Sequence, residues 1–189
     1  MTGSIWPFFM EVGYGTYSAP TTIFQTFNEF ERIRIGKYCS IASNVLVMAG
    51  GNHHFDVVST FPFDRRLAKE STDLLEAKNR AYKTTPDTVL GNDVWVGIKA
   101  VIGGGANIGD GCVIGAGAVV FSDIEPYSIV VGNPGRVVRR RFDDCTVERL
   151  LKMKWWDWPV EFIQDNLDWF YQPVPKFLSH FEESPPAGV

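Results

Sequence analysis

The chain has 189 residues, of which 45% are hydrophobic and 21% charged, the balance of an ordinary folded domain. A formal net charge of −4 gives no electrostatic basis for binding nucleic acid or an anionic membrane. No apolar run approaches the ~18 residues that a membrane span needs, and the first residues lack a signal-peptide pattern. Three widely spaced cysteines without a CxxC pair are typical of reduced thiols. We therefore expect one domain, residues 1–189, in the cytoplasm, with no nucleic-acid partner and no membrane span.

The N-terminal part of the chain carries a weak six-residue repeat. Residues 12–17 begin with Val-Gly and look like one isolated turn, and Ile35, Ile41 and Val47 then follow one another at intervals of six. We assign residues 12–47 to the first coils of a repeat structure.

Residues 48–88 interrupt the repeat and leave the blocks on either side of it out of phase. The segment is polar and charged in its second half and holds two of the three histidines. A long insertion on a regular solenoid is usually functional. We therefore predict that residues 48–88 form an active-site loop.

The clearest pattern lies in residues 89–125. An aliphatic residue recurs at every sixth position, in the order Leu90, Val96, Ile102, Ile108, Ile114 and Val120, and all but the last are followed by glycine. A helix has a period of 3.6 residues and a strand a period of two, so the pattern instead predicts a parallel β-helix with inward-pointing aliphatic residues. Three hexapeptides close one coil, so residues 18 apart should stack: Leu90 over Ile108, Val96 over Ile114, and Ile102 over Val120.

The pattern changes after residue 125. Pro126 and Pro134 break the repeat, and residues 143–170 have helical spacing, with Asp143 or Asp144 as a candidate N-cap. We predict a helical cap over residues 126–172 that covers the open end of the β-helix. The Pro-rich tail, residues 173–189, is expected to be partly disordered.

Several motifs together resemble one known family. The repeat is followed by DIEPYSIVVGNPGRVVRRRF and LLKMKWWDWP, and the loop reads GGNHHFDVVSTFPF, a histidine with an aspartate three residues later and Ser/Thr before an aromatic-Pro-Phe. These motifs, over about residues 10–170, resemble the xenobiotic acetyltransferase branch of the hexapeptide-repeat acyltransferases. That branch includes streptogramin A and type B chloramphenicol acetyltransferases and related sugar O-acetyltransferases.

The resemblance implies a mainly β fold, a left-handed parallel β-helix with the long loop insertion and the C-terminal helical tail. It also implies acetyl-CoA as the acyl donor and a homotrimer whose active sites lie between subunits. Acyl transfer to a hydroxyl needs a base, and histidine suits that role near neutral pH. The spacing of the family motif falls on His53, with His54 as the alternative, and either a backbone carbonyl or Asp56 could orient the ring. We expect direct transfer, with no covalent intermediate and no metal.

Further site residues follow from the same resemblance. Trp95 should face outward, beside the pantetheine arm or the acceptor, or else pack at a subunit interface. Backbone groups at Ile98 and Ala116 could bind the pantetheine amides. Arg136 and Arg139 could bind the CoA phosphates through their planar guanidinium groups, or instead form a solvated face paired with nearby carboxylates.

The sequence departs from the family pattern at two places. Phe121-Ser122-Asp123 lacks the lysine that related enzymes have before this aspartate, and the connection from the first turn to Ile35 is shorter than in drug-acetylating members. We therefore predict an O-acetyltransferase acting on a small hydroxyl-bearing acceptor, a carbohydrate before an antibiotic such as chloramphenicol or streptogramin A. Two remote alternatives are a noncatalytic β-helix scaffold and a zinc carbonic anhydrase, which would need three converging histidines.

Overall fold

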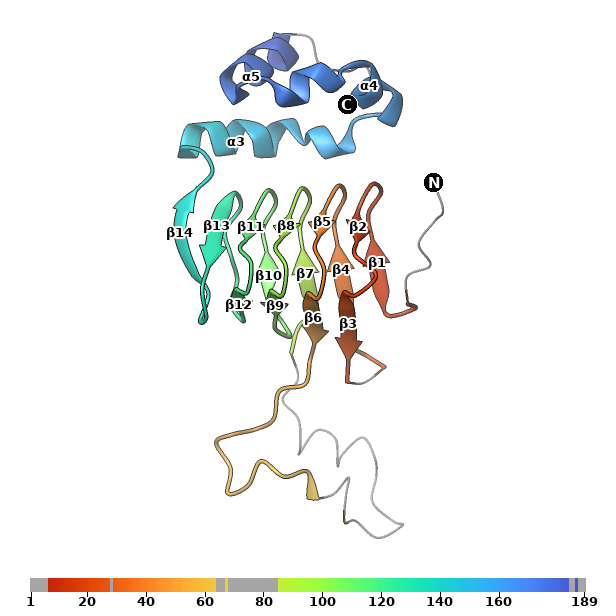
Figure 1. The fold of residues 1–189 in the computed structure, drawn as a ribbon, viewed down its shortest axis with the longest axis vertical. Helices are drawn as coiled ribbons and strands as arrows, with labels where there is room; N and C mark the ends of the chain where they lie inside the picture. Colours follow the sequence, from red (N-terminus) through yellow and green to blue (C-terminus); the bar gives the residue numbers. More distant parts are fainter. Residues whose placement is uncertain (1–6, 28, 64–66, 68–84, 184–185, 187–189) are drawn as a thin grey trace.

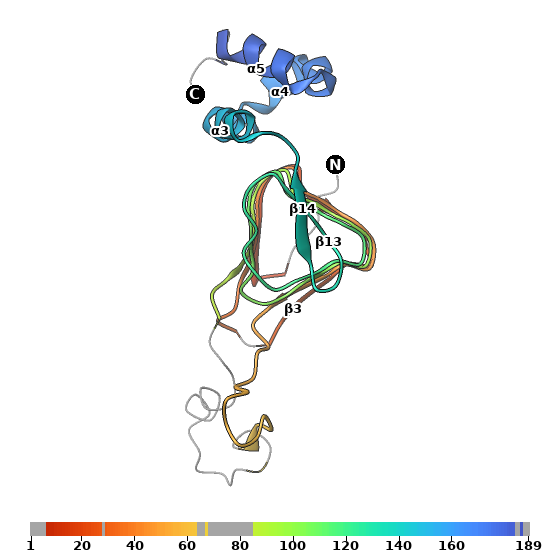
Figure 2. The same cartoon turned by 90° about the vertical axis from the view of Figure 1, so that its left-hand side faces the viewer.

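Three sheets, parallel except for the last strand, form a triangular prism. The computed structural model describes residues 7–27, 29–63, 67, 85–183 and 186. Successive strands pass to successive sheets, which we call face A (β1-β4-β7-β10), face B (β14-β13-β11-β8-β5-β2) and face C (β12-β9-β6-β3) (Figures 1 and 2). The strands are β1 (Met10–Val12), β2 (Tyr17–Ser18), β3 (Ile23–Thr26), β4 (Ile33–Ile35), β5 (Ser40–Ile41), β6 (Leu46–Ala49), β7 (Thr88–Leu90), β8 (Trp95–Val96), β9 (Val101–Ile102), β10 (Asn107–Ile108), β11 (Val113–Ile114), β12 (Val119–Val120), β13 (Ser128–Val131) and β14 (Arg136–Arg140).

The core of the prism is built from the repeat positions. The predicted 18-residue stacking is confirmed at all three pairs, Leu90 with Ile108, Val96 with Ile114 and Ile102 with Val120. These side chains are buried and face one another across the triangle. The six-residue pattern therefore identified the core of the regular coils.

The N-terminal coils join the same core without a break in register. Ile35, Ile41 and Val47 pair with Leu90, Val96 and Ile102. The two repeat blocks are out of phase in the sequence because of the length of the insertion, but their strands are in register in the structure. The prediction that residues 12–17 form an isolated turn is wrong. They belong to a complete first coil made of β1, β2 and β3, which pair with β4, β5 and β6.

The β-helix continues beyond residue 125, which corrects the predicted start of the helical region. β13 stacks on β11 in parallel, and β14 returns antiparallel to β13. Ile114 pairs with Val130 and Ile108 bridges to Ile124, so this last coil has a spacing of 16 residues, where the regular coils from β7 to β12 have 18. The shortened coil explains why the repeat is not visible in the sequence here.

The helical region begins at residue 144 and packs as one subdomain. Its elements are α3 (Asp144–Met153), η1 (Trp155–Asp157), α4 (Val160–Asp165), η2 (Leu167–Tyr171) and α5 (Val174–Glu183). Asp143 caps α3, because its carboxylate accepts the Thr146 N–H at 2.9 Å. Trp158, Phe177 and Phe181 lie in a hydrophobic cluster of their own, separate from the prism core.

The subdomain lies along one edge of the prism and not over its open end, which corrects the predicted arrangement (Figure 1). It contacts the turns between faces A and B on several coils. Lys37 pairs with Asp157 at 2.9 Å, and the Tyr38 and Trp155 rings lie 5.2 Å apart. We call this the A/B edge.

Within the tail that was expected to be partly disordered, residues Val174–Glu183 form the helix α5. Phe177, Leu178 and Phe181 are buried on one side of that helix. Pro173 and Pro175 do not prevent it, because the first N–H groups of a helix have no intrahelical partner. Residues 184–185 and 187–189 lie outside the described part. In the part that the structure describes, no helix is long and apolar enough to cross a membrane.

Candidate active site

The insertion leaves the prism between faces C and A, at what we call the C/A edge. β6 ends at Ala49 and β7 begins at Thr88, and residues 50–63 project away from the coils (Figures 1 and 2). Thr88 holds the root of the insertion. Its buried hydroxyl donates to the Met48 carbonyl at 2.7 Å and accepts the Gly105 N–H at 2.9 Å. This anchor fixes the point from which the loop extends.

Glycines let the chain turn outward at this root. Gly50 and Gly51 have φ values of 71° and 81°, in the left-handed region that favours glycine. Gly104 on the next coil approaches so closely that a Cβ there would lie 2.3 Å from the Gly50 carbonyl oxygen. The loop therefore starts from a tightly packed backbone, two residues before His53.

The His53 ring is oriented by a backbone carbonyl. Its Nδ1 lies 2.7 Å from the Thr60 carbonyl oxygen. A carbonyl can only accept, so Nδ1 carries the proton, and in the neutral form of the ring Nε2 is the nitrogen without one. That tautomer is the one a general base requires.

A short turn sets the position of the Thr60 carbonyl. The Ser59 hydroxyl accepts the Phe61 N–H at 3.1 Å, which closes a turn around Thr60. The sequence left two candidates for the group that orients His53, a backbone carbonyl and Asp56. In the structure the group beside the His53 ring is a backbone carbonyl, that of Thr60. Asp56 lies instead beside His54, with 3.8 Å between its Oδ1 and the His54 Nδ1.

The loop around His53 exposes apolar side chains. Phe55, Val57 and Val58 are exposed, and the exposed Phe61 and Phe63 rings pack edge to face at 5.0 Å. Exposed apolar groups gathered on one segment mark a surface that meets a partner or ligand.

Trp95 faces outward from face B, as predicted, and 56% of its surface is exposed. By register it lies between Ser40 and Val113. The C/A edge, from which the His53 loop extends, is opposite face B in the triangular section (Figure 2). A single chain therefore does not bring His53 and Trp95 together.

Ile98 and Ala116 lie on the third edge of the prism, between faces B and C. Both are exposed, and the Ile98 carbonyl accepts the Gly117 N–H at 2.9 Å. This hydrogen bond stacks the two turns on each other. The two predicted pantetheine contacts are therefore neighbours along an uncovered edge.

The four arginines at the end of the β-helix divide into two pairs. Arg140 binds Glu125 and Asp144, and Arg141 binds Asp93 at 2.9 Å. Arg136 and Arg139 are exposed on β14, and their guanidinium groups donate to backbone carbonyls beside them. Among the described residues, no carboxylate is paired with either of these two arginines.

The core cysteines do not suit a nucleophilic role. Cys39 and Cys112 are buried inside the coils, and their thiols donate to the Gly91 and Glu125 carbonyls at 3.1 Å. Burial raises the pKa of each thiol to about 11, which keeps it protonated near neutral pH.

The three histidines do not converge on one point. His53 and His54 lie on the loop, whereas His180 stacks on Trp169 in the helical subdomain, with 3.8 Å between the ring centroids. The loop and the subdomain extend from different parts of the prism (Figure 1). This placement does not provide the three-histidine site of the carbonic anhydrase alternative.

Comparison with known proteins agrees with this architecture. A family model described as bacterial transferase hexapeptide (six repeats) matches residues 87–122. A chloramphenicol acetyltransferase from Agrobacterium fabrum is 47% identical over 133 residues, which cover 69% of this chain and 62% of that protein. A probable macrolide acetyltransferase from Lysinibacillus sphaericus is 41% identical over 139 residues, which cover 73% of this chain and 76% of the relative.

A solved structure extends the comparison to the fold. The maltose O-acetyltransferase from Clostridium difficile 630 matches with a TM-score of 0.50 at 28% identity, over 72% of this chain and 61% of that one. The chain spans less than two thirds of the length of the Agrobacterium relative. Repeat, fold and relatives agree, and the chain belongs to the hexapeptide-repeat acyltransferases, in the branch of the xenobiotic acetyltransferases.

Proposed function

We propose that this protein transfers an acetyl group from acetyl-CoA to a hydroxyl of a small acceptor, with His53 as the general base. The observation that carries the proposal is the hydrogen bond from His53 Nδ1 to the Thr60 carbonyl, because it presents Nε2 as a proton acceptor. Nε2 takes the hydroxyl proton while the oxygen attacks the thioester carbonyl. The C–S bond then breaks, and the departing sulfur receives the proton from the imidazolium, giving the acetyl ester and free CoA.

The working assembly in this proposal is a homotrimer. The outward row of face A contains Glu11 and Arg34, which pair with each other at 3.4 Å. The outward rows of the other two faces are largely apolar: Tyr17, Ser40, Trp95, Val113 and Ile129 on face B, and Ile23, Leu46, Val101 and Val119 on face C. Two different apolar faces suit a heterologous contact that closes into a ring.

Such a ring accounts for the separation of His53 from Trp95. The loop at the C/A edge of one subunit would reach face B of the next, so that each active site takes His53 from one copy and Trp95 from another. The apolar loop residues would then be covered in the same contact.

Acetyl-CoA is proposed to lie along the edge between faces B and C. Its pantetheine arm would pass the stacked turns at Ile98 and Ala116, and its phosphates would meet Arg136 and Arg139. We also propose a left-handed coil, as the family resemblance implies, and a cytoplasmic location, which suits the unpaired thiols of Cys39 and Cys112.

Two acceptor classes are proposed. A carbohydrate is favoured by the short connection before Ile35 and by the likeness to a maltose O-acetyltransferase. An antibiotic is favoured by relatives named as chloramphenicol and macrolide acetyltransferases. The test is thiol release from acetyl-CoA over amino sugars, nucleotide sugars, chloramphenicol, a macrolide and a streptogramin A. Thiol release with only one class of compound would identify that class as the acceptor. No thiol release with any compound of the panel, under conditions in which CoA still binds, would contradict both acceptor proposals.

Replacing both Arg136 and Arg139 by alanine should raise the KM for acetyl-CoA by about 100-fold or more with kcat little changed, since each of the two charged hydrogen bonds contributes about 1.5–3 kcal/mol and about 1.4 kcal/mol is tenfold. KM is measured at low and high salt, and the variant should respond less to salt than the parent protein. Arg149→Ala is the matched control, because Arg149 pairs with Glu182 in the helical subdomain. An unchanged KM would show that β14 does not bind the phosphates.

A further inference from the structure

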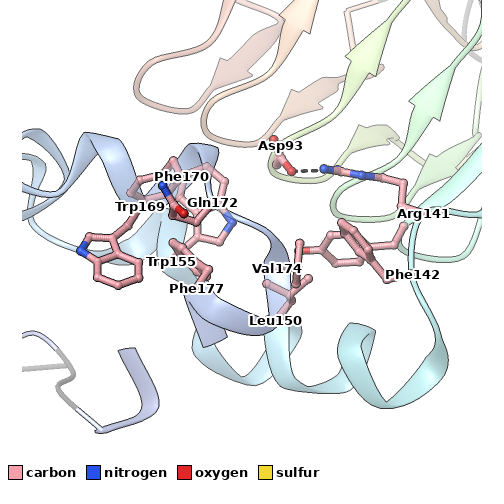
Figure 3. Close-up of a pocket in the computed structure, with 11 residues that line it drawn as sticks. Asp93, Arg141, Phe142, Leu150, Trp155, Trp169, Phe170, Gln172, Val174 and Phe177 are labelled. Carbon is pink, nitrogen blue, oxygen red and sulfur yellow. Dashed lines mark hydrogen bonds and ion pairs between the residues drawn. The ribbon is translucent and has the colours of Figure 1, made fainter. Parts of the chain in front are cut away.

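A cavity lies at the A/B edge, between the prism and the helical subdomain. Its volume is about 200 Å³. Trp155, Trp169, Phe170 and Phe177 are among its walls, and Figure 3 shows these rings on the helical side. Their ring contacts with one another keep this wall in place, for example Trp155 on Phe170 at 5.2 Å.

The prism side of the cavity is polar. Asp93 and Arg141 face each other there with an Nη1 to Oδ2 distance of 2.9 Å, and the same Nη1 donates to the Gly111 carbonyl at 2.8 Å (Figure 3). Burial raises the pKa of Asp93, while the adjacent Arg141 opposes that change. The pair places one acceptor and one donor group side by side with no net charge.

Tyr127 also lines this cavity, and its hydroxyl is unsatisfied. Its side chain is 1% exposed, and its hydroxyl is buried without a hydrogen-bond partner among the described residues. Burial raises the pKa of the hydroxyl, so it remains a neutral donor. An unpaired buried hydroxyl is costly, which favours a ligand or water that supplies an acceptor.

We propose that this cavity is a second binding site, for a small neutral aromatic compound that carries a carboxamide. The aromatic ring would pack against Trp155 and Trp169. The amide carbonyl would accept from Tyr127 and Arg141, and the amide N–H would donate to Asp93. A charged ligand fits less well, because Asp93 and Arg141 already neutralise each other.

This site is separate from the proposed acetyl transfer. The His53 loop extends from the C/A edge, whereas the helical subdomain lies along the A/B edge (Figure 1) and supplies one wall of the cavity. A carboxamide bound here would therefore leave the catalytic base uncovered. Its binding should be unaffected by His53→Ala and by saturating CoA, so the two proposals can fail independently.

Benzamide is the probe, titrated into the full chain while the tryptophan indole N–H signals are followed by NMR. We expect saturable binding with a Kd on the order of 1 mM. Cyclohexanecarboxamide and toluene, which lack the aromatic ring and the amide respectively, should bind more weakly. No saturable binding of benzamide, or equal binding of all three compounds, would overturn the proposal.

Tyr127→Phe removes the hydroxyl and keeps the ring. It should weaken benzamide binding about three- to tenfold, because one hydrogen bond is lost. The variant should melt at or above the temperature of the parent protein, since no internal hydrogen bond is broken. Val174→Phe, which narrows the cavity, is the second variant and should abolish binding. Unchanged affinity in both folded variants would place the ligand elsewhere.

Discussion

His53→Ala should lower kcat by about 10²–10⁴, the usual effect of removing a general base. The reason is local: the ring holds its proton on Nδ1, 2.7 Å from the Thr60 carbonyl, so Nε2 is the nitrogen that can take the proton of the acceptor in the proposed mechanism. CoA binding should remain nearly unchanged, because the proposed CoA contacts lie on the edge between faces B and C. The measurements are steady-state kinetics and the Kd for CoA.

His54→Ala is the control for this prediction. The two histidines are adjacent and similarly exposed, but His54 lies beside Asp56, whereas the Thr60 carbonyl is bonded to His53. We expect the His54→Ala variant to retain most of the acetyltransferase activity. If His54→Ala loses as much activity as His53→Ala, or if His53→Ala keeps the parent rate, the assignment of the base is wrong.

Sequence alone predicted the core well because the repeat is a packing pattern. Each inward aliphatic residue must match its equivalent in the next coil, and this requirement appears directly as a period of six. The stacking of Leu90 on Ile108 follows from that period. In the last coil the spacing falls to 16 residues, so Val130 occupies the position over Ile114 without continuing the six-residue count.

The position of the helical subdomain could not be predicted in the same way. Its own helices follow from spacing and from the Asp143 cap, but its docking depends on pairs far apart in the sequence. Arg141 with Asp93 and Trp155 with Tyr38 join segments that no local pattern connects. α5 was missed for a related reason: prolines at its start suggested disorder, while its buried aromatic residues gain their partners only in the folded cluster.

The sequence predicted which residues belong to the candidate site, but it did not predict their geometry. The family motif selected His53 over His54, yet the group that orients it is a main-chain carbonyl, and any residue at position 60 supplies one. The sequence signal was therefore limited to Ser59, whose hydroxyl closes the turn that aims this carbonyl. The separation of His53 from Trp95 likewise depends on which edge of the prism each segment occupies.

Leu90→Ala should lower the free energy of unfolding by about 2–5 kcal/mol, the range for large-to-small changes in a packed core. Leu90 is 1% exposed and lies between Ile35 and Ile108 in face A. The parallel ladder fixes the spacing of the coils at about 4.8 Å, so neighbouring coils cannot collapse into the space left by the leucine side chain. The free energy of unfolding of Leu90→Ala should therefore fall by the full cost of the cavity that the leucine side chain leaves.

Leu167→Ala makes the same chemical change at a residue that is 52% exposed in the helical subdomain, and should cost no more than about 0.5 kcal/mol. Both variants are compared with the parent protein by urea unfolding at one protein concentration, because the stability of a trimer would depend on concentration. Leu90→Met, which conserves volume, should recover most of the loss. Equal losses at Leu90 and Leu167 would mean that the stability of the chain does not come from the stacked interior of the prism. A large loss at Leu90 alone would show that the coil carrying β7, and with it the return of the His53 loop, is held by that interior.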